Sequence, residues 1–223
     1  MLTDEQAAIV NQVERTHVSV SAVAGSGKST LLYGICAAYP SRKILLLTYS
    51  SRLKDEARVK VNEKGLENLT VHSFHSSNIA HYGSAGYNDR ALVSTLDNEI
   101  PLKCQIDYDT FLLDETQDMN DILYRFTLKL LTDNTPNNPD EFRLVVVGDP
   151  QQSIFAYSGA NSKYLTEAHV HFGEMLPKYS ATSWEYMSLS ITFRVPQKVI
   201  HFLEQVCGYP ENKMVSHLSL IHI

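Results

Sequence analysis

The amino-acid sequence predicts an α/β fold in which a mainly parallel sheet is flanked by helices. A glycine-rich stretch lies between an alternating, strand-like run at 18–22 and apolar residues with helical spacing at 31–36. Continuous apolar runs follow at 44–47, 111–113 and 144–147, and such runs are typical of parallel strands covered on both faces. Because strand and helix patterns alternate along the chain, we expect one sheet built from strand–helix units.

The composition is that of a globular chain without a broad basic surface. The 223 residues suggest one large domain or one and a half, and 43% apolar residues can bury a substantial core. With a net charge of −6, a nucleic-acid partner has to be held by a local site and not by bulk charge. The cysteines Cys36, Cys104 and Cys207 lie far apart, as reduced thiols of a cytosolic or nuclear protein do. No signal peptide or transmembrane run is present, so no membrane partner is expected.

The glycine-rich stretch 22–30 has the context of a phosphate-binding P-loop, between a strand and a helix. Backbone N–H groups of small residues can turn around a phosphate, and the helix N-terminus adds its positive dipole end. Lys28 is expected to reach the β- and γ-phosphates of ATP, and the hydroxyl of Ser29 to ligate Mg²⁺. The nucleotide is expected to contact Ala24, Gly25, Ser26, Gly27, Lys28, Ser29 and Thr30. Ala22 replaces the first glycine of the usual pattern, and the alternative is a flexible turn.

Two adjacent carboxylates form the second strong signal. The apolar run 111–113 is followed directly by Asp114 and Glu115, which is the Walker B arrangement. Asp114 is expected to hold Mg²⁺, and Glu115 to orient and deprotonate the attacking water. The alternative is a solvated acidic loop. Together with the P-loop and the strand–helix alternation, this pair favours a RecA-like sheet.

Several polar residues at strand ends carry weaker signals. A helix is expected to start after Thr3, and the amide of Gln6 in its first turn suits adenine recognition because it both donates and accepts. Tyr49 follows the run 44–47, where α/β sheets place ligands, but helix capping and packing are equally good readings of this segment. His72 and His75 lack a third ligand at a suitable spacing, so no metal is expected there.

Seven segments in order resemble superfamily I DNA helicases of the UvrD/Rep type, over nearly all of residues 2–203. They are 2–6 (Q motif), 22–30 (AxAGxGKT loop), 48–51 (motif Ia), 70–74 (TxHSF), 114–118 (DExQD), 147–160 (motif III) and 189–199 (motif IV). Motifs III and IV are most similar to those of F-box and phage-type relatives. This chain has Ser158 and Thr30 at two positions where the family commonly has arginine.

The resemblance implies ATP and Mg²⁺ as cofactors and single-stranded DNA, or a duplex junction, as the partner. It implies that Gln152 senses the γ-phosphate and that Phe193 covers the adenine. Arg194 would be an arginine finger, expected on a helix with no second lobe beneath it. The DNA-facing residues would be Tyr49, Ser50, His72, Phe74 and Tyr157, with aromatic rings that stack on bases. For Tyr157 and Phe193 the alternative is core packing.

The resemblance also divides the chain. Residues 1–188 are expected to form lobe 1A, with 76–107 as a reduced 1B-like insertion. Residues 189–210 would begin a second RecA-like lobe, 2A, and 211–223 fit no motif and are expected to be a non-native tail of an incomplete gene model.

The implied function is that of the N-terminal motor lobe of an ATP-dependent DNA helicase or translocase. We expect this lobe to be monomeric and inactive without its second lobe. Two alternatives remain: a non-motor module that binds ATP and single-stranded DNA, and another P-loop NTPase such as a kinase. The glutamine-rich motif III argues against the kinase.

Overall fold

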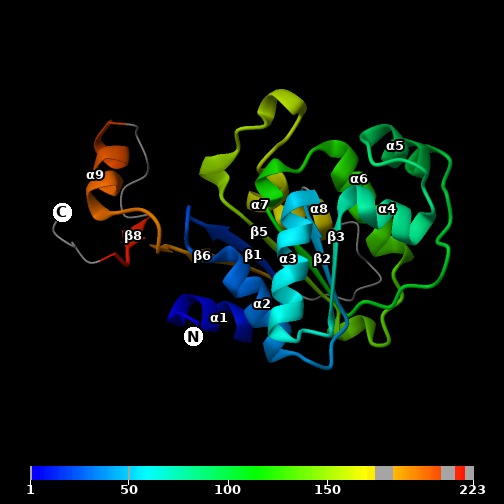
Figure 1. Ribbon diagram of the computed structural model, residues 1–223, viewed down its shortest axis with the longest axis horizontal. Helices are drawn as coiled ribbons and strands as arrows, with labels where there is room; N and C mark the ends of the chain where they lie inside the picture. Colours follow the sequence, from blue (N-terminus) through cyan, green and yellow to red (C-terminus); the bar gives the residue numbers. More distant parts are fainter. Residues whose placement is uncertain (1, 50, 174–182, 207–213, 219–223) are drawn as a thin grey trace.

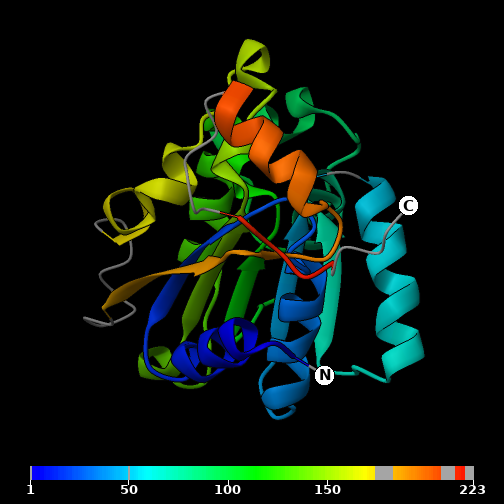
Figure 2. The same cartoon turned by 90° about the vertical axis from the view of Figure 1, so that its left-hand side faces the viewer.

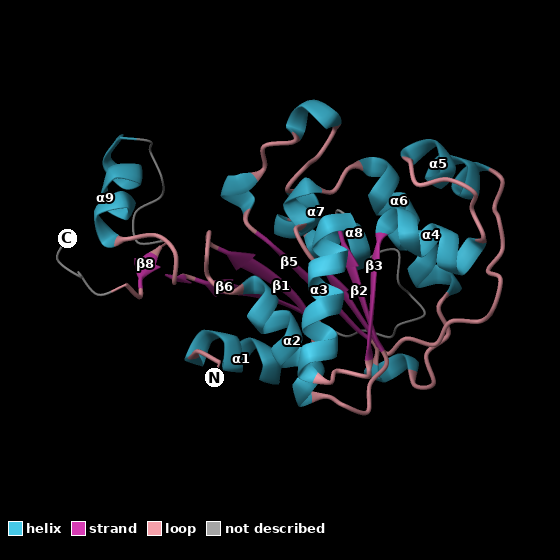
Figure 3. Cartoon of the chain, viewed as in Figure 1, coloured by secondary structure: helices cyan, strands magenta, loops and turns pink. Residues whose placement is uncertain are grey.

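The computed structural model of the chain describes residues 2–49, 51–173, 183–206 and 214–218. Its centre is a six-stranded sheet in the order β3-β2-β4-β5-β1-β6, with every neighbouring pair parallel (Figures 1 and 3). The strands are β1 (His17–Ala22), β2 (Ile44–Thr48), β3 (Leu69–Ser73), β4 (Thr110–Leu113), β5 (Arg143–Gly148) and β6 (Trp184–Leu189). The expected parallel α/β fold is confirmed.

Helices cover both faces of the sheet. Side chains of a strand alternate between faces, so in β2 Ile44 and Leu46 pack into one core while Leu45 and Leu47 pack into the other. The first core contains residues of α1 (Asp4–Val13), α2 (Lys28–Ala38) and α3 (Ser51–Lys64). The second contains residues of α4 (Phe74–Tyr82), α5 (Asp89–Asp97), α6 (Asp121–Asp133), α7 (Lys163–Thr166) and α8 (Ala168–Gly173). This double burial explains the continuous apolar runs.

The stretch 76–107, expected to be a reduced insertion, contributes to the second core. Tyr82 of α4 and Leu92 of α5 are buried there, and the Tyr82 ring meets Phe126 of α6 edge to face. These two helices therefore belong to the helical layer that covers the sheet.

Strand β6 has no counterpart among the strands predicted from sequence. It pairs with β1 at the edge of the sheet, where only Leu189 among its residues is buried. An edge strand whose side chains are mostly exposed or half-buried lacks the continuous apolar run that revealed β2, β4 and β5.

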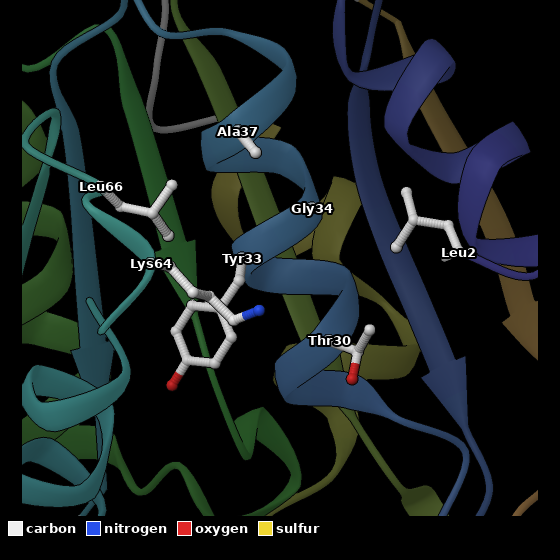
Figure 4. A pocket seen from close by; sticks show the side chains of 7 residues that line it. All are labelled: Leu2, Thr30, Tyr33, Gly34, Ala37, Lys64 and Leu66. Carbon is white, nitrogen blue, oxygen red and sulfur yellow. The ribbon is translucent and has the colours of Figure 1, made fainter. Parts of the chain in front are cut away.

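Close packing of α1 against α2 brings the N-terminal helix to the glycine-rich loop. A groove along α2 is lined by Leu2, Thr30, Tyr33, Gly34, Ala37, Lys64 and Leu66 (Figure 4). A Cβ atom on Gly34 would lie 3.0 Å from Cδ2 of Leu2, so the glycine lets Leu2 approach the helix. Thr3 caps α1 through a capping box with Gln6, as expected.

A small C-terminal unit follows β6. Strand β7 (Ile191–Thr192) pairs in parallel with β8 (Val215–Ser216), and α9 (Gln197–Val206) lies between them in sequence. Figure 2 shows this unit in orange and red across the N-terminal end of α2. Ile200 and Met214 are buried together with Val23 of the glycine-rich loop. Within 211–223, expected to be non-native, residues 214–218 are described and supply β8 and Met214.

Among the described residues, no helix is long and apolar enough to cross a membrane. Cys36 is a buried free thiol and Cys104 an exposed one, whereas Cys207 lies outside the described residues.

Candidate nucleotide site and nucleic-acid interface

The glycine-rich loop connects β1 to the N-terminus of α2. Gly25 and Gly27 have φ values of +73° and +84°, a region that side-chain-bearing residues rarely adopt. Helix α2 begins at Lys28, so its first N–H groups and the positive end of its dipole lie at the loop.

Gln6 holds one half of this loop from α1. Its Nε2 donates to the carbonyl oxygens of Ser26 and Gly27 at 3.2 and 3.4 Å, and its Oε1 accepts the N–H of Thr3 at 3.0 Å. The side chain is 2% exposed. Both ends of the amide are therefore engaged by the protein, and the predicted adenine contact would require these bonds to open.

Residues that follow β6 hold the other half. Oγ1 of Thr192 donates to the carbonyl of Ala24 at 2.7 Å, and the N–H of Phe193 donates to the carbonyl of Gly25 at 3.0 Å. Four successive loop carbonyls thus have protein donors. Within the described part of the chain, the N–H groups of Gly25, Gly27, Lys28 and Ser29 donate no hydrogen bond. Such a set of free N–H groups at a helix N-terminus suits an anion.

Lys28 and Glu115 meet across the site. Nζ of Lys28 lies 3.2 Å from Oε2 of Glu115, and Nε2 of Gln117 donates to the same oxygen at 3.0 Å. Glu115 has a φ of +52°, a conformation that costs a residue with a side chain on the order of 1–3 kcal/mol. The structure therefore brings together the two charged side chains that the sequence assigned to ATP chemistry.

Negative charge exceeds positive charge at this point. Burial, together with the charge of Glu115, raises the pKa of Asp114 to about 7, while Lys28 opposes the shift. The same causes raise the pKa of Asp118 to about 6. Several carboxylates around one ammonium favour an additional cation.

The residues present fit Mg²⁺. Ser29 and Asp114 line one small cavity between α2, α3 and the sheet. Magnesium is commonly bound by one or two carboxylates together with substrate phosphates and water, and a hydroxyl and a carboxylate face a shared cavity here.

Gln117 connects this site to β5 and the loop that follows it. Its Oε1 accepts the N–H of Asp149 at 3.0 Å, its Nε2 also reaches Oδ2 of Asp118 at 3.3 Å, and its backbone carbonyl accepts from Oγ of Ser153 at 3.3 Å. A Cβ atom on Gly148 would overlap with Oε1 of Gln117. A side chain at position 148 would therefore require Gln117 to shift out of these hydrogen bonds.

Gln152, the predicted γ-phosphate sensor, is linked to Gln117 through Asp149, to which both residues are hydrogen-bonded. It is exposed in the 3₁₀ turn Pro150–Gln152, and its Nε2 donates to Oδ2 of Asp149 at 2.6 Å. The side chain that bonds Glu115 directly is Gln117.

An aromatic surface, formed by Tyr49, Phe155 and Tyr157, lies beyond this link. The rings of Tyr49 and Phe155 stack with centroids 5.8 Å apart, and those of Phe155 and Tyr157 lie 6.0 Å apart. Tyr157 is 84% exposed, so of the two readings made from sequence the core-packing one is wrong. The structure brings Tyr49 and Tyr157 together through Phe155, and Ser50 lies outside the described residues.

The other two residues expected to face DNA differ in exposure. His72 is half-buried and bonds Oγ of Ser76 through Nδ1. Burial first, and then the charges of His81, Arg58 and Lys54, lower the pKa of His72 to about 4, so its ring is neutral. Phe74 is 3% exposed and belongs to the core beneath α4. Its side chain does not reach a surface, which corrects its assignment as a DNA contact.

Phe193 and Arg194 lie in the connection between β7 and α9. The expectation that Arg194 stands on an unsupported helix is wrong, because its segment is bonded to the P-loop. A Cβ atom on Gly25 would overlap with Cβ of Arg194, and the Arg194 side chain is exposed. The Phe193 ring is partly exposed and packs at a tilt against His217, with centroids 4.7 Å apart.

Four residues that shape the candidate site were missed by the sequence interpretation. Gln117, Gly148 and Phe155 lie within recognised segments, so the motif letters could have revealed them. Thr192 lies within the segment 189–199, but nothing in the sequence indicates its contact with the P-loop.

The fold and the site define the class: this is a P-loop NTPase domain. The chain belongs to the AAA domain family, which matches residues 5–158. A comparison with curated proteins found no match.

Solved structures share the fold at low identity. The chain is similar to the Pif1 helicase from Candida albicans, with 17% identity and a TM-score of 0.53 over 96% of this chain and 46% of that one. It is also similar to Bacteroides sp Pif1 in complex with ADP-AlF4, with 16% identity and a TM-score of 0.51 over 96% of this chain and 48% of that one. The chain thus spans about half the length of these helicases. A P-loop NTPase domain is confirmed, and the assignment to helicases of the UvrD/Rep type stays a prediction.

Proposed function

We propose that this chain is the nucleotide-binding motor lobe of a superfamily I DNA helicase or translocase. One observation carries the proposal: Gln117 bonds both Glu115 of the nucleotide site and Asp149, which begins the loop bearing Phe155 and Tyr157. A change at the nucleotide can therefore reach the aromatic surface through one side chain. Coupling of this kind distinguishes a motor from a module that merely binds ATP and DNA.

The nucleotide-binding half of the proposal rests on the loop. Its free N–H groups and Lys28 would bind the phosphates of ATP, and Ser29 and Asp114 would hold Mg²⁺. Bound Mg²⁺ supplies charge neutralisation at the phosphates. Glu115, fixed by Lys28 and Gln117, would orient a water molecule and accept its proton. Gln152 would sense the γ-phosphate, and Arg194 would neutralise charge there.

The DNA-binding half rests on the aromatic surface. Base–aromatic stacking tolerates any sequence because every base has a π-face, which suits a motor that follows a strand. With a net charge of −6 for the chain, a local stacking site explains strand binding better than bulk attraction.

The test is binding of a fluorescently labelled single-stranded oligonucleotide to wild type and to Tyr157→Ala. Loss of one stacking ring should weaken binding about 5- to 150-fold, since stacking is worth about 1–3 kcal/mol per base. Tyr186→Ala is the matched control, because Tyr186 is an exposed tyrosine on the edge strand β6. Equal affinity of wild type and Tyr157→Ala would refute the DNA interface.

A further inference from the structure

The segment that follows β6 is fixed at both ends to the nucleotide half of the molecule. The carboxylate of Glu5 in α1 accepts hydrogen bonds from the N–H and the hydroxyl of Ser190. Three residues on, the N–H of Phe193 donates to the carbonyl of Gly25 at 3.0 Å. Between these points lies Thr192, which is fully buried.

The hydroxyl of Thr192 makes three hydrogen bonds. It donates to the carbonyl of Ala24 at 2.7 Å and accepts the N–H groups of Arg194 and Val195, both at 3.2 Å. One oxygen atom thus joins the P-loop to the backbone of the proposed arginine finger. No other side chain described here bonds both segments.

The position of these bonds on the loop decides what they do. Thr192 and Phe193 donate hydrogen bonds to the carbonyls of Ala24 and Gly25, respectively. Gln6 donates to those of Ser26 and Gly27. Because successive carbonyl and N–H groups of a tight loop turn to different sides, holding the carbonyls leaves the N–H groups available to an anion. Gly25 allows the close approach, since a Cβ atom there would lie 3.0 Å from Oγ1 of Thr192.

We propose that Thr192 is a positioning residue: its hydroxyl holds the P-loop in its anion-binding shape and fixes Arg194 beside it. The inference rests on the proposed nucleotide site and deepens it. Because these bonds join the loop to the 190–195 segment, a shift of the segment would change the loop, and a nucleotide bound by the loop would in turn stabilise the segment.

The test compares Thr192→Val, which keeps the shape but removes the hydroxyl, with Thr192→Ser, which restores it. The matched control is Thr127→Val, because Thr127 is also fully buried and its hydroxyl donates to a helix carbonyl, that of Leu123 in α6. Two quantities are measured for each chain: hydrogen–deuterium exchange without nucleotide, and the affinity for Mg-ADP by calorimetry.

Without nucleotide, Thr192→Val should exchange faster than wild type in peptides that cover 22–30 and 190–196, whereas Thr192→Ser and Thr127→Val should not. Its affinity for Mg-ADP should fall about 3- to 10-fold, the effect of losing one or two hydrogen bonds, and serine should restore it. Unchanged exchange in Thr192→Val would overturn the proposal. So would faster exchange with wild-type affinity, because the hydroxyl would then serve stability alone.

These readouts separate the two proposals. If wild type binds no Mg-ADP, the proposed function fails, and the exchange of the unliganded chain still decides whether Thr192 holds the loop. If wild type binds and Thr192→Val binds equally well, the nucleotide site stands and the positioning role falls.

Discussion

Nζ of Lys28 lies 3.2 Å from Oε2 of Glu115, so the ammonium of the P-loop is paired with the carboxylate proposed to activate water. Both side chains are mostly buried, at 14% and 27% exposure. A phosphate that enters the loop has to compete with Glu115 for Lys28. The pair therefore opposes phosphate binding until the phosphates replace the carboxylate beside Lys28.

Replacement of Lys28 should remove nucleotide binding. Lys28→Ala takes away the ammonium that offsets Glu115, Asp114 and Asp118, so the site would repel phosphate. We expect the affinity for Mg-ADP in calorimetry to fall at least about 10-fold, the effect of losing a charged contact. Lys43→Ala is the control, because Lys43 is paired with Asp107 at the opposite ends of the strands. Equal affinity of Lys28→Ala and wild type would rule out the phosphate role.

Glu115→Gln should bind nucleotide at least as tightly as wild type. An amide keeps the size of the side chain but releases Lys28 from its ion pair. It cannot accept a proton, so any ATP turnover should fall roughly 10²–10⁴-fold. Calorimetry with Mg-ADP measures the first effect, and phosphate release by a longer chain with a second lobe measures the second. Unchanged turnover would show that Glu115 is not the base.

Gly148→Ala should disturb the link between the two halves of the site. The added Cβ would overlap with Oε1 of Gln117, which also accepts the N–H of Asp149. Overpacking of this kind typically costs about 1–3 kcal/mol in the free energy of unfolding. Urea denaturation measures the loss, with Gly173→Ala as the control, because the nearest atom to its Cβ, Nε1 of Trp184, lies at an ordinary 3.7 Å. Equal denaturation midpoints for the two variants would contradict the expected overlap between a Cβ atom at position 148 and Gln117.

The sequence predicts those parts of the fold whose burial repeats along the chain. Strands β2, β4 and β5 are fully buried and appear as apolar runs, whereas the edge strand β6 has mostly exposed or half-buried side chains and shows no such run. Within the site, Lys28 and Glu115 follow from local motifs. A motif does not say which way a side chain points, and so Phe74 was placed at the surface although it lies in the core.

Contacts between distant segments are the part that sequence patterns cannot supply. Thr192 and Ala24 lie 168 residues apart, and their bond depends on the path of the chain after β6. The same path supports Arg194, which local reasoning left unsupported.

The pH dependence of stability should reveal the buried imidazole of His17. Burial first, and then the charge of Arg143, lower the pKa of His17 from 6.5 to about 4, and its Nδ1 accepts the N–H of Leu144 at 3.0 Å. Between pH 6.5 and about pH 4, His17 is protonated in the unfolded chain and neutral in the native chain. The contribution of His17 is therefore complete above pH 6.5 and is lost as the pH falls to 4. The shift corresponds to about 3 kcal/mol in the free energy of unfolding.

The measurement is urea denaturation of wild type and His17→Gln at pH 7.5 and pH 4.5. Glutamine offers an oxygen to the N–H of Leu144 but does not titrate, so its stability should fall less between the two pH values. Asp114 and Asp118, whose pKa values are raised, change stability in the opposite direction to His17. His72, whose pKa is lowered, changes it in the same direction as His17. All three residues are present in both proteins. The difference between the two chains therefore isolates His17. If wild type and variant lose stability in parallel, His17 has the same pKa in the folded and unfolded chain. That result would contradict a pKa lowered by burial and by the charge of Arg143.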